Sequence, residues 1–386
     1  MNFEFATAGR IIFGSGSIKR LGALAAELGK KALITSGFRD GSQPNCTLVD
    51  NLNAAGVAAQ CFTIPGEPTV ELIQQGAELA KAERCDLVIG YGGGSAMDAG
   101  KAIAALTTNP GTVLDYLEVI GGGKSLSLPS LPMIAIPTTS GTGSEVTRNA
   151  VVSSQDKHVK VSMRSPWMLP RIALVDPDLT LQLPPAITAS TGLDALTQLI
   201  EPFVCNVPIP IVDAICRAGI PTAASSLRRA YFHGDDQQAR ENMSLASLFG
   251  GLALANAKLG AVHGFAGVLG GMYPAPHGVI CALLLPLVVE TNINALQERD
   301  PQNPTLGKFG ELARLLTGKP AAVTQDAINW LYRIRDELKI PGLAIFGFQV
   351  AEIPLIVEKS AQASSMKGNP ITLTPADMES ILVRAA

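Results

Sequence analysis

The sequence predicts an α/β protein, in which a Rossmann-like N-terminal domain with a mostly parallel, doubly wound sheet precedes an all-α C-terminal domain. Over residues 1–180, short β-rich runs alternate with stretches in which apolar residues recur at helical spacing. After Pro184 and Pro185 this alternation stops, and long segments rich in Ala and Leu follow. We therefore expect an α/β domain over residues 1–180 and a helical domain over residues 181–386.

The first domain contains two predicted helices and six predicted strands. Ser17–Leu28 and Thr69–Arg84 have the spacing of amphipathic helices, and Gly29 is expected to end the first of them in the left-handed conformation. Strands that alternate with helices form βαβ units, which bind ligands at the carboxyl ends of their parallel strands. The predicted strands are Ile11–Phe13, Ala32–Thr35, Ala58–Ile64, Leu87–Tyr91, Met133–Ile136 and Ile172–Val175.

In the second domain, strand-like alternation is largely absent and the apolar residues keep the period of a helix. The segments predicted as helices are Pro185–Val204, Asp236–Lys258, Val279–Asn292 and Ala322–Leu338.

Composition and charge favour an enzyme that acts on small molecules. The chain has 386 residues, 47% of them hydrophobic, and a net charge of −3 without a basic run, which excludes nucleic acid and anionic membranes as expected partners. The longest apolar run, Val279–Val289, contains Pro286 and is too short to span a bilayer, and the N-terminal residues lack an apolar signal segment. Six cysteines without a Cys-x-x-Cys pair are expected to be buried thiols. We therefore expect a cytoplasmic protein.

Two loops rich in glycine and hydroxyl groups follow predicted strands. Gly92–Lys101 reads GGGSAMDAGK, and such a turn exposes backbone N–H groups at the positive end of a helix, where a pyrophosphate can bind. Ser95 and Asp98 also have the spacing of a capping box, so helix initiation alone is the alternative. Pro137–Val146 offers further hydroxyls that can bond ribose and phosphate oxygens. Together the two loops favour a dinucleotide site.

A second group of residues has the pattern of a metal site. Asp194 and Gln198 are one helical turn apart, so their oxygens can reach one point. His263 is predicted to lie on an apolar helix and His277 in a Pro-His-Gly loop. Their two imidazoles can bind the same ion as these oxygens. A hydrogen-bonded buried Asp with two core histidines is the alternative.

The segments GGGSAMDAGK and PTTSGTGSEVTRNAVV resemble the signature stretches of the iron-containing (group III) alcohol dehydrogenases. The similarity continues through ALVDPDLT, GLDALTQLIE, GAVHGFAGVLGG and PHGVICALLLP, and so covers nearly the whole chain. The resemblance implies a dinucleotide-binding domain over 1–180, a metal-binding domain over 181–386, and hydride transfer between NAD(P)(H) and a small alcohol or aldehyde. It further implies a divalent Fe or Zn ion and a homodimer.

The resemblance also assigns roles to single residues. The implied metal set is Asp194, Gln198, His263 and His277, of which the Asp and the two His are also the implied catalytic residues. Position 198 departs from the family, which usually has a His there, and a Gln oxygen is expected to bind metal more weakly and to favour oxygen-loving ions. Gly267 stands where many members have a His near the nicotinamide, so the proton must leave by a ribose hydroxyl, water or another group. The implied cofactor contacts are Gly93, Gly94, Ser95, Asp98, Thr138, Thr139, Thr142 and Lys160.

Gly37 and Arg39 are the residues expected to meet the adenosine ribose. A Rossmann-type site usually offers an acidic residue after the second strand, and Gly37 stands where NAD-preferring relatives have an Asp. Without that carboxylate a 2′-phosphate is not repelled, and Arg39 could attract it. The alternative is a simple turn at Gly37 with a solvated Arg39. We predict that NADP(H) is accepted at least as well as NAD(H).

No residue identifies the substrate. Members of the resembled family act on primary alcohols, diols, lactaldehyde or oxo-acids such as maleylacetate. Alternatives are therefore a maleylacetate-reductase-like or glycerol-dehydrogenase-like enzyme on the same scaffold, and a cofactor-binding relative with little catalysis. The substrate is expected in a cleft between the two domains.

Overall fold

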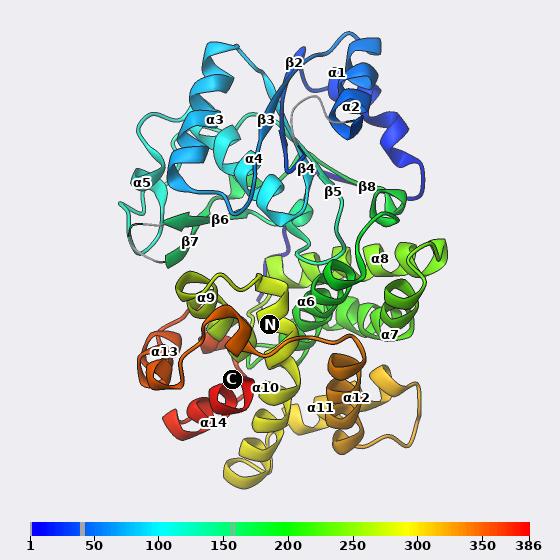
Figure 1. Ribbon diagram of the computed structural model, residues 1–386, viewed down its shortest axis with the longest axis vertical. Helices are drawn as coiled ribbons and strands as arrows, with labels where there is room; N and C mark the ends of the chain where they lie inside the picture. Colours follow the sequence, from blue (N-terminus) through cyan, green and yellow to red (C-terminus); the bar gives the residue numbers. More distant parts are fainter. Residues whose placement is uncertain (1, 39–42, 155, 157–158) are drawn as a thin grey trace. The chain divides into compact units, whose positions relative to one another are not determined.

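The computed structural model describes residues 2–38, 43–154, 156 and 159–386 (Figure 1). The chain forms two compact units. The sheet unit consists of Ala6–Thr139 and Gly143–Leu181, and the helical unit consists of Gln182–Ala386, Ser140–Thr142 and the N-terminal segment up to Phe5.

The sheet unit is built on six parallel strands in the order β1-β8-β5-β4-β2-β3. All six predicted strands are confirmed, and each end agrees within one residue. From β2 the sheet grows through β3 in one direction and through β4, β5 and β8 in the other, so the strand order reverses between β2 and β4. The strands are β1 (Arg10–Phe13), β2 (Lys31–Ser36), β3 (Ala58–Thr63), β4 (Leu87–Gly92), β5 (Met133–Pro137) and β8 (Ile172–Val175).

Helices cover both faces of this sheet, as the predicted doubly wound fold requires. Side chains alternate along each strand, so that Leu33 and Val88 pack with α3 and α4, whereas Ile34 and Ile89 pack with α1 and α2. The helices are α1 (Leu21–Ala26), preceded by a 3-10 turn at Ser17–Arg20, α2 (Gln43–Ala54), α3 (Val70–Ala82), α4 (Gly94–Thr108) and the short α5 (Val113–Tyr116).

The prediction that Gly29 ends the first helix in the left-handed conformation is wrong. This residue does not adopt that conformation, and α1 already ends at Ala26. A Cβ added at Gly29 would lie 2.3 Å from Asp86 Oδ1. That carboxylate accepts hydrogen bonds from the backbone N–H groups of Lys30 and Lys31 at 2.8–2.9 Å. The glycine is needed for this close approach and not for a positive φ.

A small antiparallel sheet of β6 (Asn149–Ser154) and β7 (Val159–Arg164) was not predicted. Its outward positions are polar except for Val151, so the hairpin lacks the continuous apolar run of the central strands. The backbone N–H of Ser153 donates to the carbonyl of Pro68 at 2.8 Å, which attaches this hairpin to the loop after β3.

The helical unit is confirmed as all-α, since residues 182–386 are all described and contain no strand. One large hydrophobic core joins its helices. They are α6 (Pro185–Val204), α7 (Pro210–Phe232), α8 (Gln237–Asn256), α9 (Ala261–Met272), α10 (His277–Arg299), α11 (Thr305–Thr317), α12 (Thr324–Glu337), α13 (Ile353–Ala361) and α14 (Pro375–Ala385).

Among the described residues, α10 is the one single helix long and apolar enough to cross a membrane by length and composition. However, 83% of its most apolar window is buried inside the protein. The pair α8 and α9 passes the same test only as a unit, and it is bent by 94°. Burial in the core of the helical unit accounts for the apolar sequence of α10.

Candidate metal centre

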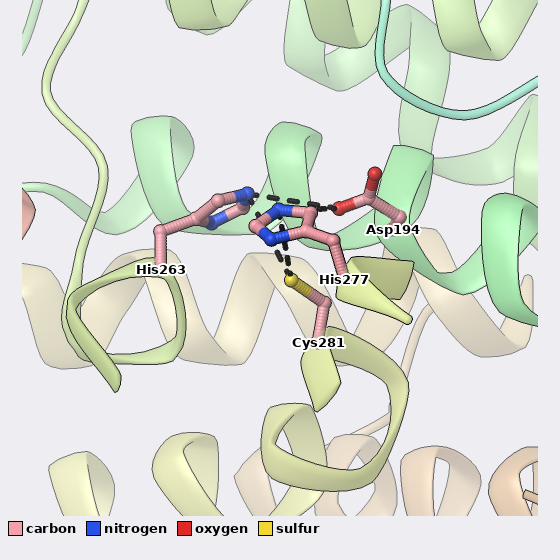
Figure 2. A group of neighbouring side chains, drawn as sticks. All are labelled: Asp194, His263, His277 and Cys281. Atoms are coloured by element: carbon pink, nitrogen blue, oxygen red, sulfur yellow. Dashed lines mark hydrogen bonds and ion pairs between the residues drawn. The ribbon is translucent and has the colours of Figure 1, made fainter. Parts of the chain in front are cut away.

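Four side chains from three helices of the helical unit point toward one another (Figure 2). Asp194 lies on α6, His263 on α9, and His277 and Cys281 on α10. One ligand atom from each residue lies within 4.8 Å of the others. The structure therefore brings together three of the four residues predicted to hold metal and adds a cysteine that was not predicted.

The distances within this cluster are close to those of a coordination shell. Asp194 Oδ1 is 3.6 Å from His263 Nε2 and 3.8 Å from His277 Nε2. The sulfur of Cys281 is 3.5 Å from His277 Nε2 and 4.0 Å from His263 Nε2. In a tetrahedral site with metal–ligand distances of about 2.0–2.3 Å, neighbouring ligand atoms are about 3.3–3.8 Å apart. These four distances lie within a few tenths of an ångström of that range, and all pairs of ligand atoms lie within 4.8 Å.

The local sequence explains why α10 reaches the cluster. His277 is the first residue of α10 and Cys281 follows one turn later, so both project from one side of the helix. Gly278 permits the close contact with α6, since a Cβ added there would lie 2.7 Å from the carbonyl oxygen of Ser190. This contact brings the first turn of α10 next to Asp194.

Asp194 and Gln198 are both buried and both carry an oxygen without a hydrogen-bond partner. Asp194 is 1% exposed and its Oδ1, the oxygen that faces the imidazoles, is unpartnered. Gln198 donates from Nε2 to Asp194 Oδ2 at 3.2 Å, and its own Oε1 is unpartnered. A buried polar atom left without a partner costs about 1–3 kcal/mol, and a bound cation would satisfy the carboxylate.

Glu201 holds the imidazole of His263 in place and was not predicted to have a role. Its Oε2 lies 2.6 Å from His263 Nδ1, and its Oε1 accepts from the backbone N–H of Val262 at 2.7 Å. Carboxylates in this position fix the tautomer and orientation of metal-binding histidines. Glu201 follows Asp194 by seven residues on the same face of α6, and this spacing was the available signal.

The electrostatics of the cluster favour positive charge. Burial opposes ionisation of Asp194, but His263 and His277 outweigh it and hold the pKa of the carboxyl below its ordinary value. Burial alone would lower the pKa of His263, but Cys281 and Glu201 raise it well above its ordinary value. Cys281 is also the largest influence that raises the pKa of His277. A group of side chains that attracts protons in this way is suited to hold a cation instead.

Replacing Glu201 by glutamine is expected to weaken metal binding by about 10–100-fold. This is the usual effect of losing a carboxylate that is hydrogen-bonded to a histidine ligand. A glutamine amide has a single acceptor oxygen, so it could not accept from both His263 Nδ1 and the backbone N–H of Val262, and the ring would be held less firmly. Metal titration of chelator-treated protein measures the effect. Glu290→Gln on α10 is the control, because that carboxylate bonds Tyr332 and Arg384 instead. Equal affinities in both variants would contradict the role of Glu201.

The glycines predicted to hold the cofactor gather at the carboxyl edge of the sheet. Gly93 precedes α4 without a side-chain cap, which leaves the first N–H groups of this helix available. Gly92 has a φ of 149°, which favours glycine, and a Cβ added there would lie 3.6 Å from the backbone nitrogen of Gly37. A Cβ added at Gly93 would lie 3.5 Å from Thr139 Oγ1. The loops after β2, β4 and β5 therefore meet at one place.

Ser95 and Asp98 do not form the capping box that their spacing suggests. The helix starts at Gly94, and the carboxylate of Asp98 does not reach back to Ser95. Instead, Asp98 Oδ1 accepts from Ser144 Oγ at 2.6 Å, and Oδ2 accepts from the backbone N–H of Val151 at 2.9 Å. Asp98 thus ties α4 to the hydroxyl-rich loop, while Ser95 and Gly94 lie in the first turn of α4.

The remaining predicted cofactor residues lie in several places. The backbone N–H of Thr138 donates to Gly92 at 2.9 Å, which joins the loops after β4 and β5. Lys160 lies on β7 and pairs with Glu67, in the loop after β3, at 3.1 Å. Thr142 belongs to the segment grouped with the helical unit. Arg39 lies outside the described residues.

Gly267, where the resembled family has a His, is exposed on α9 one turn after His263. A Cβ added at this glycine would meet no described heavy atom within 4 Å. The structure therefore offers no steric reason for the glycine.

Comparison with known proteins identifies the family. The sequence profile described as iron-containing alcohol dehydrogenase matches residues 8–177, and the profile of the C-terminal domain of the same family matches residues 188–386. The chain is 34% identical over 381 residues to the 1,3-propanediol dehydrogenase of Klebsiella pneumoniae, with 95% of each chain covered. It is 32% identical over 383 residues to the NAD-dependent methanol dehydrogenase of Bacillus methanolicus, with 97% of each covered.

A solved structure gives the same result. The crystal structure of a 1,3-propanediol oxidoreductase matches with a TM-score of 0.92 and 32% sequence identity over 100% of both chains. The resemblance predicted from the two loops is therefore confirmed over the whole chain. The protein belongs to the iron-containing alcohol dehydrogenase family, whose members are nicotinamide-dependent oxidoreductases that act on alcohols and diols.

Proposed function

We propose that Asp194, His263 and His277 hold a divalent metal ion in this alcohol dehydrogenase and form its catalytic centre. One observation carries the proposal: the buried and unpartnered Oδ1 of Asp194 faces the Nε2 atoms of both imidazoles. A divalent ion bound there would act as a Lewis acid toward the oxygen of the alcohol or carbonyl group. The fourth donor has two candidates, namely the predicted Gln198 and the neighbouring Cys281.

The side chains around this centre position it. Glu201 orients His263 through the bond to Nδ1, which leaves Nε2 directed at Asp194. Gln198 fixes the other carboxylate oxygen of Asp194. With glycine at position 267, α9 supplies no second imidazole one turn after His263, so proton transfer falls to other groups.

We further propose that the sheet unit binds the dinucleotide. Its support is the meeting of three strand-end loops at the reversal of the strand order, beside the uncapped start of α4. The N–H groups of Gly94 and Ser95 would bind the pyrophosphate, and the hydroxyls of Thr138 and Thr139 would bind ribose. The helical unit would then be the metal-binding domain. Asp98, Thr142 and Lys160 remain predicted cofactor contacts.

The proposed substrates are small uncharged alcohols and the corresponding aldehydes, since the relatives above are named for 1,3-propanediol and methanol. We still expect a homodimer in the cytoplasm, and light scattering of the purified protein measures the molar mass that a dimer would have.

The activity is tested by reduction of short aldehydes with NADH or NADPH after Zn²⁺ or Fe²⁺ is added to chelator-treated protein. Turnover that requires the metal is the expected result, and turnover that is unaffected by its removal would overturn the metal centre.

We predict that NADP(H) is used at least as efficiently as NAD(H). Gly37 is exposed at the end of β2, and among the described residues a Cβ added there would meet only the carbonyl oxygen of Ile64, at 3.8 Å. Because no described atom excludes a side chain, Gly37→Asp is expected to place a carboxylate against the 2′-phosphate and lower kcat/KM with NADP more than tenfold, with little change for NAD. Gly37→Asn is the uncharged control. A wild-type kcat/KM ten times higher with NAD than with NADP would contradict the prediction.

A further inference from the structure

Cys281 occupies a position that the sequence-based metal set does not explain. Its side chain is fully buried, and its sulfur lies 3.5 Å from His277 Nε2 and 4.0 Å from His263 Nε2. Figure 2 shows the sulfur directed into the group formed by the two imidazoles and Asp194. The unpartnered Oδ1 of Asp194, itself 1% exposed, faces the same group. Four ligand atoms of three chemical kinds thus surround one point.

Gln198 is less well placed to be the fourth donor. Its Nε2, not its Oε1, is directed at Asp194, and the carboxylate dictates this orientation because a flipped amide would bring two oxygens together at 3.2 Å. The Oε1 instead lies 3.5 Å from the position that a Cβ would take at Gly250 on α8. Gln198 therefore orients Asp194 by a hydrogen bond to Oδ2, the carboxylate oxygen that does not face the imidazoles.

We propose that the thiolate of Cys281 is the fourth protein ligand of the metal ion, with Asp194, His263 and His277 as the other three. This inference rests on the proposed function only for the presence of an ion in the cluster. On binding, the S–H bond of Cys281 breaks, its proton passes to water, and a metal–sulfur bond forms without any change of oxidation state. The one-turn spacing of His277 and Cys281 gives the ion two ligands from a single helix.

A thiolate changes which ion the site prefers. Sulfur is a softer donor than an amide or carboxylate oxygen, and a set of one thiolate, two imidazoles and one carboxylate suits Zn²⁺. With Cys281 as a ligand, we expect the site to prefer zinc over Mg²⁺ or Mn²⁺, whereas coordination by Gln198 would shift selectivity toward oxygen-loving ions.

The test is spectroscopic and does not depend on activity. Chelator-treated wild-type protein is titrated with Co²⁺, which replaces Zn²⁺, and its near-ultraviolet spectrum is recorded for the charge-transfer band of a cobalt–thiolate bond. We expect this band in the wild type, in Gln198→Ala and in Cys216→Ser, because Cys216 is a buried cysteine of α7 outside the cluster. We expect its loss in Cys281→Ser.

Competition with a chelator then gives the Zn²⁺ affinities. Cys281→Ser is expected to weaken Zn²⁺ binding by more than about a hundredfold, because a ligand is lost. Gln198→Ala is expected to weaken it by about 10–100-fold, the usual effect of removing a residue that only orients a ligand. Wild-type protein that binds Co²⁺ without a thiolate band would overturn the role of Cys281 and leave the proposed metal centre intact. Wild-type protein that binds neither Co²⁺ nor Zn²⁺ would overturn both. Melting temperatures of the metal-free proteins confirm that each variant is folded.

Discussion

Asp194→Asn is expected to abolish metal-dependent turnover, with kcat reduced by at least about a thousandfold. The amide cannot supply the negative charge that the buried Oδ1 presents to the two imidazoles. A metal ion acting as a Lewis acid contributes several kcal/mol to catalysis, and about 4 kcal/mol corresponds to a thousandfold in rate. Two measurements check the result, namely the metal content of protein purified without chelators and kcat at saturating aldehyde.

Asp236→Asn provides the control for this substitution. Asp236 is the N-cap of α8 in the same unit, where it bonds the backbone N–H of Ala239, and asparagine is an equally good N-cap. We expect this variant to keep both its metal and its activity. An Asp194→Asn protein that retains bound metal and more than a tenth of wild-type kcat would contradict the assignment of Asp194.

The second large effect is expected in the sheet unit, where Lys101→Met should lower the free energy of unfolding by about 3–5 kcal/mol. Lys101 is 1% exposed on α4, and burial lowers its pKa while Asp98 counteracts this effect. Removing the ammonium group would leave three neutral acceptors without this donor, and it would remove the charge paired with the partly buried carboxylate of Asp98, which keeps its bonds from Ser144 and Val151. The acceptors are Ser144 Oγ at 2.6 Å, Thr147 Oγ1 at 2.8 Å, the carbonyl of Asn149 at 2.9 Å and Asp98 Oδ1 at 3.2 Å.

The two tryptophans allow this effect to be measured in one unit. Trp167 lies in the sheet unit and Trp330 in the helical unit, so urea unfolding in a Trp330→Phe background follows the sheet unit by fluorescence. Lys124→Met is the matched control, because Lys124 pairs with Asp115 at 2.6 Å on the surface, where such pairs contribute little. Equal shifts of the midpoint in the two variants would show that the buried network does not stabilise the unit.

The fold was largely predictable because its elements have strong local patterns. The central strands are continuous apolar runs, and α6 was predicted with both ends as observed because Pro184 and Pro185 mark its start. The β6–β7 hairpin was missed because its buried residues alternate with mostly polar ones and so form no continuous apolar run. Gly29 shows a different limit, since its contact with Asp86 joins residues 57 positions apart and no local pattern reports it.

The candidate site was predictable only where residue type and spacing coincide with a known pattern. Asp194, His263 and His277 were selected in this way, because the family resemblance favoured metal binding over a hydrogen-bonded Asp with two core histidines. Cys281 was grouped with the buried thiols, although its spacing of four residues from His277 was visible in the sequence. Glu201 acts through His263, and the packing of α6 against α9 that joins them is a tertiary contact. Such contacts cannot be derived from local periodicity.

The unequal burial of the cluster has a consequence for the kinetics of metal exchange. The side chains of Asp194 and His263 are 2% and 8% exposed and Cys281 is fully buried, whereas the side chain of His277 is 36% exposed. We therefore expect an ion to leave past His277, the most exposed of these ligands, when the first turn of α10 opens. Because α10 is anchored in the core along its remaining length, this opening is expected to be slow. The rate of metal loss should then reach a plateau as chelator concentration rises, at a value set by the opening of the helix.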